Sequence, residues 1–134
     1  MRALVKSLRH IPANHAAHDL LLEVLRELAA DLLRHRQASG MWHQLVDEPD
    51  SFPETSGTGF IVSALQAAAR NGWIEASSGA EALTAFVSPD GTVLNGCPET
   101  PPLPSREDYR NRHPKPDDPH AVAAVLMALG GVQP

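Results

Sequence analysis

Residues 40–74, GMWHQLVDEPDSFPETSGTGFIVSALQAAARNGWI, decide the fold of this chain. The first part of this stretch mixes aromatic, polar and turn-forming residues and contains Pro49 and Pro53, so it predicts a loop between helices. The second part repeats apolar residues at helical steps and ends at Gly72, which predicts a helix over residues 56–71. Its many small residues predict close packing against another helix. The predicted apolar face holds Phe60, Ile61, Ala64, Leu65, Ala68 and Ala69.

A longer helix is predicted upstream, over residues 14–37, because apolar residues recur there at three- and four-residue steps. Gly40 is placed to end this helix. The apolar arc is wide, which predicts neighbours on more than one side. The predicted buried face holds Leu21, Val24, Leu25, Leu28 and Leu32.

Two shorter helices are predicted downstream. Ser78 and Glu81 have the spacing of a capping box, which predicts a helix over residues 79–87. Asp118 as cap and Pro119 in the first turn predict the start of a last helix, which ends at the glycine pair after Leu129. The predicted buried residues are Leu83, Phe86 and Val87 in the first of these helices and Val122, Val125, Leu126 and Leu129 in the second.

The stretch between these two helices predicts loops. Ser88-Pro89-Asp90-Gly91 is a strong turn signal, and residues 92–94 after it predict a short extended piece. Most of the prolines fall from Pro89 to Pro119, where they exclude long regular elements. The predicted fold is therefore all-α, a single domain over residues 1–134 with long loops and a short extended, hairpin-like segment.

Composition narrows the possible functions. The chain has 134 residues, 43% of them hydrophobic and 20% charged, which is the balance of a globular protein. Its net charge is -5 and its basic residues are scattered, so a nucleic-acid partner is not expected. The absence of a long apolar run predicts no membrane partner and a cytoplasmic protein. The single cysteine, Cys97, excludes an internal disulfide.

The loop and helix of residues 40–74 resemble a segment of the unsaturated rhamnogalacturonyl and glucuronyl hydrolases, glycoside hydrolase families 105 and 88. The shared elements are Gly-x-Trp-x-Gln, Asp-x-Pro, Glu-x-Ser and a small-residue helix that ends in Arg-x-Gly. The flanking helices and SPDGTVLNGC are similar too. The resemblance implies the C-terminal part of an (α/α) toroid, a ring of helical hairpins whose inner ends form a sugar pocket. It also implies the chemistry, in which an aspartate protonates the C4–C5 double bond of an unsaturated uronic acid, and it implies no metal or organic cofactor.

The same resemblance sets a limit on activity. The family's general acid/base aspartate lies in the N-terminal part of the ring, and no residue of this chain matches it. The prediction is therefore a truncated or split hydrolase segment with a remnant sugar pocket, no catalytic residue and no activity alone. The alternative is a non-catalytic helical interaction or carbohydrate-binding module that oligomerises through exposed helix faces. The expected partners are an unsaturated uronic acid oligosaccharide and either further copies of the chain or a companion chain.

Five residues are predicted to contact sugar: Trp42, Gln44, Glu54, Ser56 and His120. Trp42 can stack on a sugar ring while Gln44 bonds its hydroxyls, or they can plug a helix pair and tie down the loop. Glu54 and Ser56 stand where the predicted helix begins, so they can cap it, with the serine hydroxyl as the cap, or face a uronate carboxylate. His120 can bond a neighbouring loop or, by the resemblance, face the pocket.

Other chemistry-bearing residues are predicted to have no catalytic or metal-binding role. Asp47 and Asp50 lie beside Pro49 in a polar turn and are predicted to be solvated. The spacing of Cys97, His113 and His120 fits no compact zinc pattern, so no metal site is expected. The histidines at positions 10, 15 and 18 are interpreted as a solvated helix end.

Overall fold

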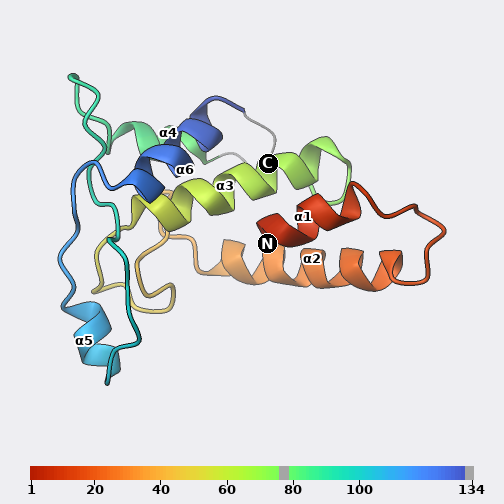
Figure 1. Ribbon diagram of the computed structural model, residues 1–134, viewed down its shortest axis with the longest axis horizontal. Helices are drawn as coiled ribbons and strands as arrows, with labels where there is room; N and C mark the ends of the chain where they lie inside the picture. Colours follow the sequence, from red (N-terminus) through yellow and green to blue (C-terminus); the bar gives the residue numbers. More distant parts are fainter. Residues whose placement is uncertain (76–78, 132–134) are drawn as a thin grey trace.

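The computed structural model describes residues 1–75 and 79–131, and within these ranges the chain is helical. The described helices are α1 (Arg2–Leu8), α2 (His18–Arg34), α3 (Thr55–Arg70), α4 (Ala80–Thr84), α5 (Arg106–Arg110) and α6 (Pro119–Leu129) (Figure 1). The described residues contain isolated bridges but no strand, and one bridge joins Val87 to Val93 across the predicted turn. The all-α class is confirmed.

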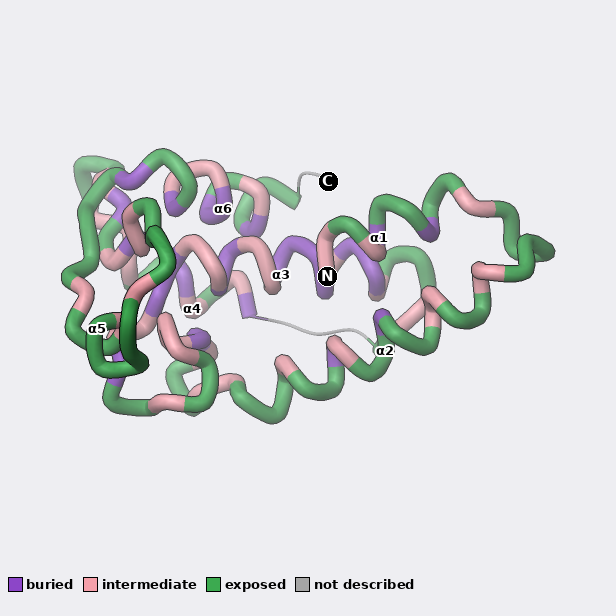
Figure 2. The backbone as a smooth tube through the Cα atoms, turned by 60° about the horizontal axis from the view of Figure 1, so that its bottom comes forward, coloured by how far each residue is buried: buried purple, intermediate pink, exposed green. Residues whose placement is uncertain are grey.

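The central element is α3, which is contacted by α6, α4 and α1, while α2 packs against α1 (Figure 1). Figure 2 shows burial concentrated along α3 and exposure along the outer side of α2 and in α5. One core cluster lies between α3, α4 and α6 and includes Trp42, and a second lies between α1, α2 and α3. The predicted α3 face was too narrow, since Thr55, Thr58 and Ser63 are buried as well. A helix with neighbours on several sides buries small polar residues whose hydroxyls bond nearby carbonyls.

Helices α3 and α6 approach each other very closely. A methyl group added at Gly59 would lie 2.6 Å from the backbone carbon of Ala124, so the two backbones leave no room for any side chain there. The buried side of α6 is accordingly made of small residues, Ala121, Ala124, Val125 and Ala128. The predicted α6 face was wrong at Leu126 and Leu129, which are 63% and 44% exposed. Helix α6 packs on α3 through its alanine face, because leucines on that face would hold the two backbones apart.

The long helix α2 begins at His18, later than predicted, and ends at Arg34. Of its five predicted buried residues only Leu25 is fully buried, and Val24 is 40% exposed. Helix α2 has neighbours on more than one side, as predicted, since Leu25 belongs to the cluster with α1 and α3 and Ala29 to the cluster with Trp42. Its outer side is open, and Leu20 is 62% exposed there. The short helix α1, which buries Val5 and Leu8, was not predicted.

The remaining differences are in short helices. The helix α4 ends at Thr84 rather than at 87, and the predicted capping residue Ser78 lies outside the described residues. The helix α5 was missed because it lies in the proline-rich stretch. Its local signal was present, since Ser105 caps it by accepting a hydrogen bond from the Asp108 amide at 3.2 Å. The predicted cap of α6 at Asp118 is confirmed, and so is the predicted stop of α3 at Gly72, which has φ 71°. The predicted stop of α2 at Gly40 is wrong, because this helix already ends at Arg34.

Candidate functional site

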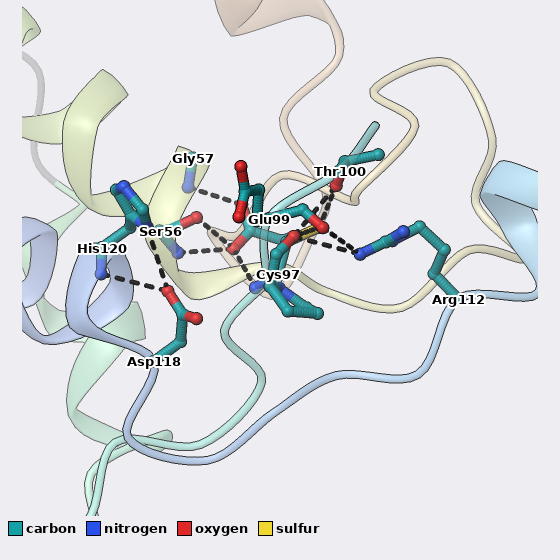
Figure 3. A network of polar contacts seen from close by, with 10 residues as sticks. Ser56, Gly57, Cys97, Glu99, Thr100, Arg112, Asp118 and His120 are labelled. Carbon is teal, nitrogen blue, oxygen red and sulfur yellow. Dashed lines mark hydrogen bonds and ion pairs between the residues drawn. The ribbon is translucent and has the colours of Figure 1, made fainter. Parts of the chain in front are cut away.

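The first turns of α3 and α6 meet at residues 95–97. The Thr55 amide donates to the Asn95 carbonyl at 3.1 Å, and the Cys97 amide donates to Oε1 of Glu54 at 2.9 Å. Gly96 lies against the start of α6, because a methyl group there would lie 2.8 Å from Cβ of Ala121 and 2.9 Å from Cβ of Asp118. The starts of α3 and α6 and the loop of residues 95–97 therefore form one edge of the molecule, hereafter the rim (Figure 3).

Glu54 lies beneath this rim and is 6% exposed. Its carboxylate accepts from the Ser56 amide at 2.7 Å, the Ser56 hydroxyl at 2.5 Å, the Gly57 amide at 2.5 Å and the Cys97 amide at 2.9 Å. The first amides of α3 are therefore already bonded to a carboxylate of the chain itself. The prediction that the Ser56 hydroxyl caps α3 is wrong, because the longer Glu54 side chain reaches two amides of the first turn and Ser56 donates to it.

Trp42 lies behind the rim, in the core, and is 1% exposed. Its indole Nε1 donates to the Leu32 carbonyl at 2.6 Å, and its backbone amide donates to the Thr58 hydroxyl at 3.0 Å. The guanidinium of Arg36 lies 5.5 Å from the ring centroid. In this structure the ring offers almost no open face to a sugar, which favours the alternative interpretation that Trp42 closes the end of a helix pair.

Gln44, Ser56 and His120 reach the rim. Gln44 is half-buried, its Nε2 lies 3.8 Å from Sγ of Cys97, and its Oε1 has no hydrogen-bond partner within residues 1–75 and 79–131. Ser56 is half-buried. The imidazole of His120 is 70% exposed, with Nδ1 3.3 Å from the buried carboxylate of Asp118. The structure thus brings together three of the five predicted residues, places Glu54 under them and places Trp42 behind them.

Two further residues of the rim were not predicted from the sequence. Thr100 places its Oγ1 3.4 Å from Sγ of Cys97, and Arg112 donates from Nη2 to the carbonyls of Pro98 at 3.2 Å and Glu99 at 2.7 Å (Figure 3). Both residues belong to the proline-rich loop. A loop without periodicity carries no spacing from which such contacts can be inferred.

An ion-pair cluster joins the loop of residues 45–51 to α5. Arg106 bonds Asp47 at 2.7 Å and Glu48 at 2.5 Å, and Arg110 bonds the other oxygen of Glu48 at 2.6 Å. The hydrogen bond from Arg106 is the main cause that lowers the pKa of Asp47 and of Glu48, and for Glu48 the bond from Arg110 lowers it further. Asp47 in turn raises the pKa of Arg106. Asp47 is therefore exposed to solvent, as predicted, and it is ion-paired as well.

The attachment of α5 should depend on pH in the acidic range. Both carboxyls have a folded pKa below the ordinary values of 3.8 for Asp47 and 4.5 for Glu48, so their ion pairs are complete above the unfolded pKa and are lost as the pH falls through the folded pKa. We expect the NMR signals of the Arg106 and Arg110 Nε–H groups to stay constant from about pH 7 to 5 and to move below about pH 4. A change confined to the range above pH 5 would contradict this assignment.

The described residues hold no group of three side chains that could bind a metal ion. They also contain no helix with the length and apolar character needed to cross a bilayer. A hollow of about 600 Å³ lies between α2 and residues 72–75, and another of about 340 Å³ lies between the chain start, α2 and α3. Neither contains a predicted sugar-contacting residue. We assign the candidate site to the rim, because polar side chains from three separate segments converge there.

A central helix packed against several other helices, with no strand among the described residues, defines an all-α protein. The family model described as Glycosyl Hydrolase Family 88 matches residues 1–133, so the chain belongs to this family. The resemblance inferred from residues 40–74 is therefore confirmed.

The similar proteins are much longer than this chain. It is 28% identical over 107 residues to the unsaturated rhamnogalacturonyl hydrolase YesR of Bacillus subtilis (strain 168), covering 80% of this chain and 31% of that protein. It is 29% identical over 100 residues to the unsaturated 3S-rhamnoglycuronyl hydrolase of Alteromonas sp. (strain LOR), covering 68% of this chain and 24% of that protein. The chain therefore spans less than a third of the length of these curated relatives.

Solved structures show the same fold. A possible member of the GH105 family from Salmonella enterica serovar Paratyphi A superposes with a TM-score of 0.88 at 24% identity, over 96% of this chain and 36% of that one. A family 105 glycoside hydrolase from C. acetobutylicum ATCC 824 superposes with a TM-score of 0.82 at 23% identity, over 96% and 42%. These similarities confirm the predicted helical toroid class for the part of the fold that this chain represents.

Proposed function

We propose that this chain is one domain of an unsaturated glycuronyl hydrolase of the rhamnogalacturonyl type, the C-terminal portion of its toroid, and that its rim forms one side of the sugar pocket. The observation that carries the proposal is the convergence of Gln44, Ser56 and His120 at one rim, although they come from separate segments. The curated relatives are named as hydrolases of unsaturated rhamnogalacturonyl and rhamnoglycuronyl sugars, which supports a substrate of that class.

In this proposal the rim binds sugar and performs no proton transfer to the double bond. The general acid/base aspartate belongs to the part of the fold that this chain does not match, so no residue here is assigned a catalytic role. Glu54 already occupies the first amides of α3, so a uronate carboxylate or sugar hydroxyl would meet the exposed His120 ring and the amide of Gln44 instead. Glu54 and Trp42 then support the rim from below and behind.

Calorimetry with an unsaturated galacturonyl-rhamnose disaccharide tests this role. We expect weak binding by the unchanged chain and a severalfold loss in His120→Gln, because His120 is exposed and its ring is not needed to cap α6, where Asp118 accepts from the backbone amide at 3.0 Å. The control is His10→Gln, an exposed histidine after α1. Equal binding by the two variants, or no binding by the unchanged chain, would count against the rim as a sugar site.

A turnover assay tests the assignment of catalysis. Loss of the enol absorbance of the disaccharide should not occur with this chain alone, and robust hydrolysis by the purified chain would overturn the proposal that the acid/base residue lies elsewhere. A companion chain that supplies the remaining helices should restore turnover.

A cytoplasmic location remains a prediction from the sequence.

A second candidate function, an oligomerising helical module, is favoured by the outward leucines of α2 and α6. Leu20, Leu126 and Leu129 are 62%, 63% and 44% exposed, and Leu126 and Leu129 lie about one turn apart on the same side of α6. This candidate predicts self-association that Leu126→Gln together with Leu129→Gln abolishes, with Leu94→Gln as a control on the hairpin-like segment. Sedimentation velocity at micromolar concentration checks it, and a monomer in the unchanged chain would exclude it.

A further inference from the structure

A groove of about 600 Å³ lies between α2 and residues 72–75, the segment that follows α3. Helix α2 contributes an arginine and an apolar wall, and the segment contributes a tryptophan and a glutamate. These residues are Arg26, then Ala29, Ala30 and Leu33, and opposite them Trp73 and Glu75. The volume is within the range of about 300 to 1,000 Å³ that is typical of small-molecule sites. No residue of the rim lines this groove.

The segment after α3 is fixed against the helices. Gly72 turns the chain with φ 71°, and the Trp73 amide donates to the Ala68 carbonyl at 3.1 Å. From the other wall, Nε of Arg26 donates to the Trp73 carbonyl at 2.8 Å, so a hydrogen bond joins the two sides of the groove. Trp73 and Ile74 also pack against the core cluster between α1, α2 and α3. The groove is therefore formed before any ligand enters, which lowers the cost of binding.

Three polar groups of the groove have no hydrogen-bond or ion-pair partner within residues 1–75 and 79–131. They are the two terminal nitrogens of the Arg26 guanidinium, the indole Nε1 of Trp73 and the carboxylate of Glu75. The indole of Trp42 differs, because its Nε1 donates to the Leu32 carbonyl. Two donor groups and one acceptor group of the groove are therefore available to a ligand.

The chemistry of these groups determines which ligand fits. With Nε bonded to the Trp73 carbonyl, the Arg26 guanidinium still presents its two Nη groups, which can bind a carboxylate through two parallel hydrogen bonds. The indole N–H can donate to a hydroxyl, and the Glu75 carboxylate can accept from one. The apolar wall of α2 suits the C–H face of a ring. A uronic acid residue carries a carboxylate, hydroxyls and such a face together.

We propose that this groove is a second saccharide site, which holds a uronic acid residue of an acidic sugar chain away from the rim. The free donors and the acceptor point to a ligand with a carboxylate and hydroxyls, and the choice of a sugar ring rests on the proposed function. The groove holds the chain and takes no part in its cleavage.

The indole N–H signals of the two tryptophans in an NMR spectrum test this site. The probe is saturated digalacturonate, and a Trp73→Phe variant assigns the two signals. The Trp73 signal should move during the titration. The Trp42 signal should stay in place, because its N–H is bonded to Leu32 and the residue is 1% exposed. Galactobiose, which has the same rings without carboxylates, should need a severalfold higher concentration for the same shift.

Two substitutions at Ala30 separate charge from size. Ala30 is exposed on the wall of the groove, one turn after Arg26, so a change there leaves the bond from Arg26 to Trp73 intact. Ala30→Glu places a carboxylate where it pairs with Arg26 and repels a uronate, so the apparent dissociation constant should rise severalfold. Ala30→Gln has nearly the same size without the charge and should bind clearly more tightly than Ala30→Glu.

The variant His120→Gln separates the groove from the rim. It should leave the response of the Trp73 signal to digalacturonate unchanged, and a loss of that response would place the ligand at the rim and overturn the second site. A Trp73 signal that does not move, an equal response to galactobiose, or equal binding by the two Ala30 variants would overturn it as well. A moving Trp73 signal in a chain whose rim binds no unsaturated disaccharide would refute the proposed function and support the groove.

Discussion

Replacing Trp42 by alanine is expected to lower the free energy of unfolding by about 4 kcal/mol, because it removes the largest of the fully buried side chains among the described residues. The ring is 1% exposed and packs in the core cluster between α3, α4 and α6. Its removal leaves a large cavity and also leaves the Leu32 carbonyl without its indole donor. Urea unfolding followed by circular dichroism measures the loss.

Two further variants separate the causes. Trp42→Phe keeps most of the apolar volume but loses the bond to Leu32, so we expect a smaller loss of about 1 to 2 kcal/mol. Trp73→Ala is the control. Because Trp73 is only half-buried, this variant should lose less free energy of unfolding than Trp42→Ala. A chain that tolerates Trp42→Ala as well as Trp73→Ala, yet loses sugar binding, would restore Trp42 as a residue that stacks on sugar.

Replacing Glu54 by alanine is expected to cost about 3 kcal/mol, because it leaves the helix start without its cap and the Cys97 amide without a partner. The carboxylate satisfies four donors at once, and no other described side chain takes its place at these amides. Thermal unfolding measures the effect. The control is Glu23→Ala, an exposed carboxylate on α2, which should change stability little.

Glu54→Gln distinguishes the two interpretations of this residue. The amide has a similar shape, but its NH₂ group would face donors where the carboxylate presents an acceptor, so stability should fall between that of the unchanged chain and that of Glu54→Ala. If Glu54 instead acted mainly by contacting sugar, Glu54→Gln would keep the stability of the unchanged chain and lose binding. That pattern would refute the capping role.

Much of the fold could be predicted because its signals are local. Asp118 and Pro119 predict the start of α6, and Gly72 predicts the end of α3, because capping residues and glycines determine helix ends through contacts within a few residues. The short helix α1 was missed because its two turns carry too little periodicity to be recognised. The short helix α5 was missed because it lies in the proline-rich stretch. The family was recognisable because its motifs lie within one short stretch.

The buried faces could not be predicted in the same way. Leu126 is more apolar than Ala124, yet Ala124 is buried and Leu126 is exposed, because the alanine side permits the close approach of α6 to Gly59. Val24 belongs to the apolar stripe of α2 but remains 40% exposed, because α2 packs along α1 on one side. Periodicity identifies a face that could be buried, but only a neighbour buries it.

The sequence by itself determined the helical class, the limits of α3 and α6 and the loop that carries the rim, since each depends on residues close together in the chain. Only the tertiary structure decided that Ser56 stands at the rim while Trp42 lies behind it, and that Glu54 rather than Ser56 caps α3. The physical reason is that these arrangements rest on contacts between distant segments, such as Glu54 with Cys97, whose partners no local pattern reveals.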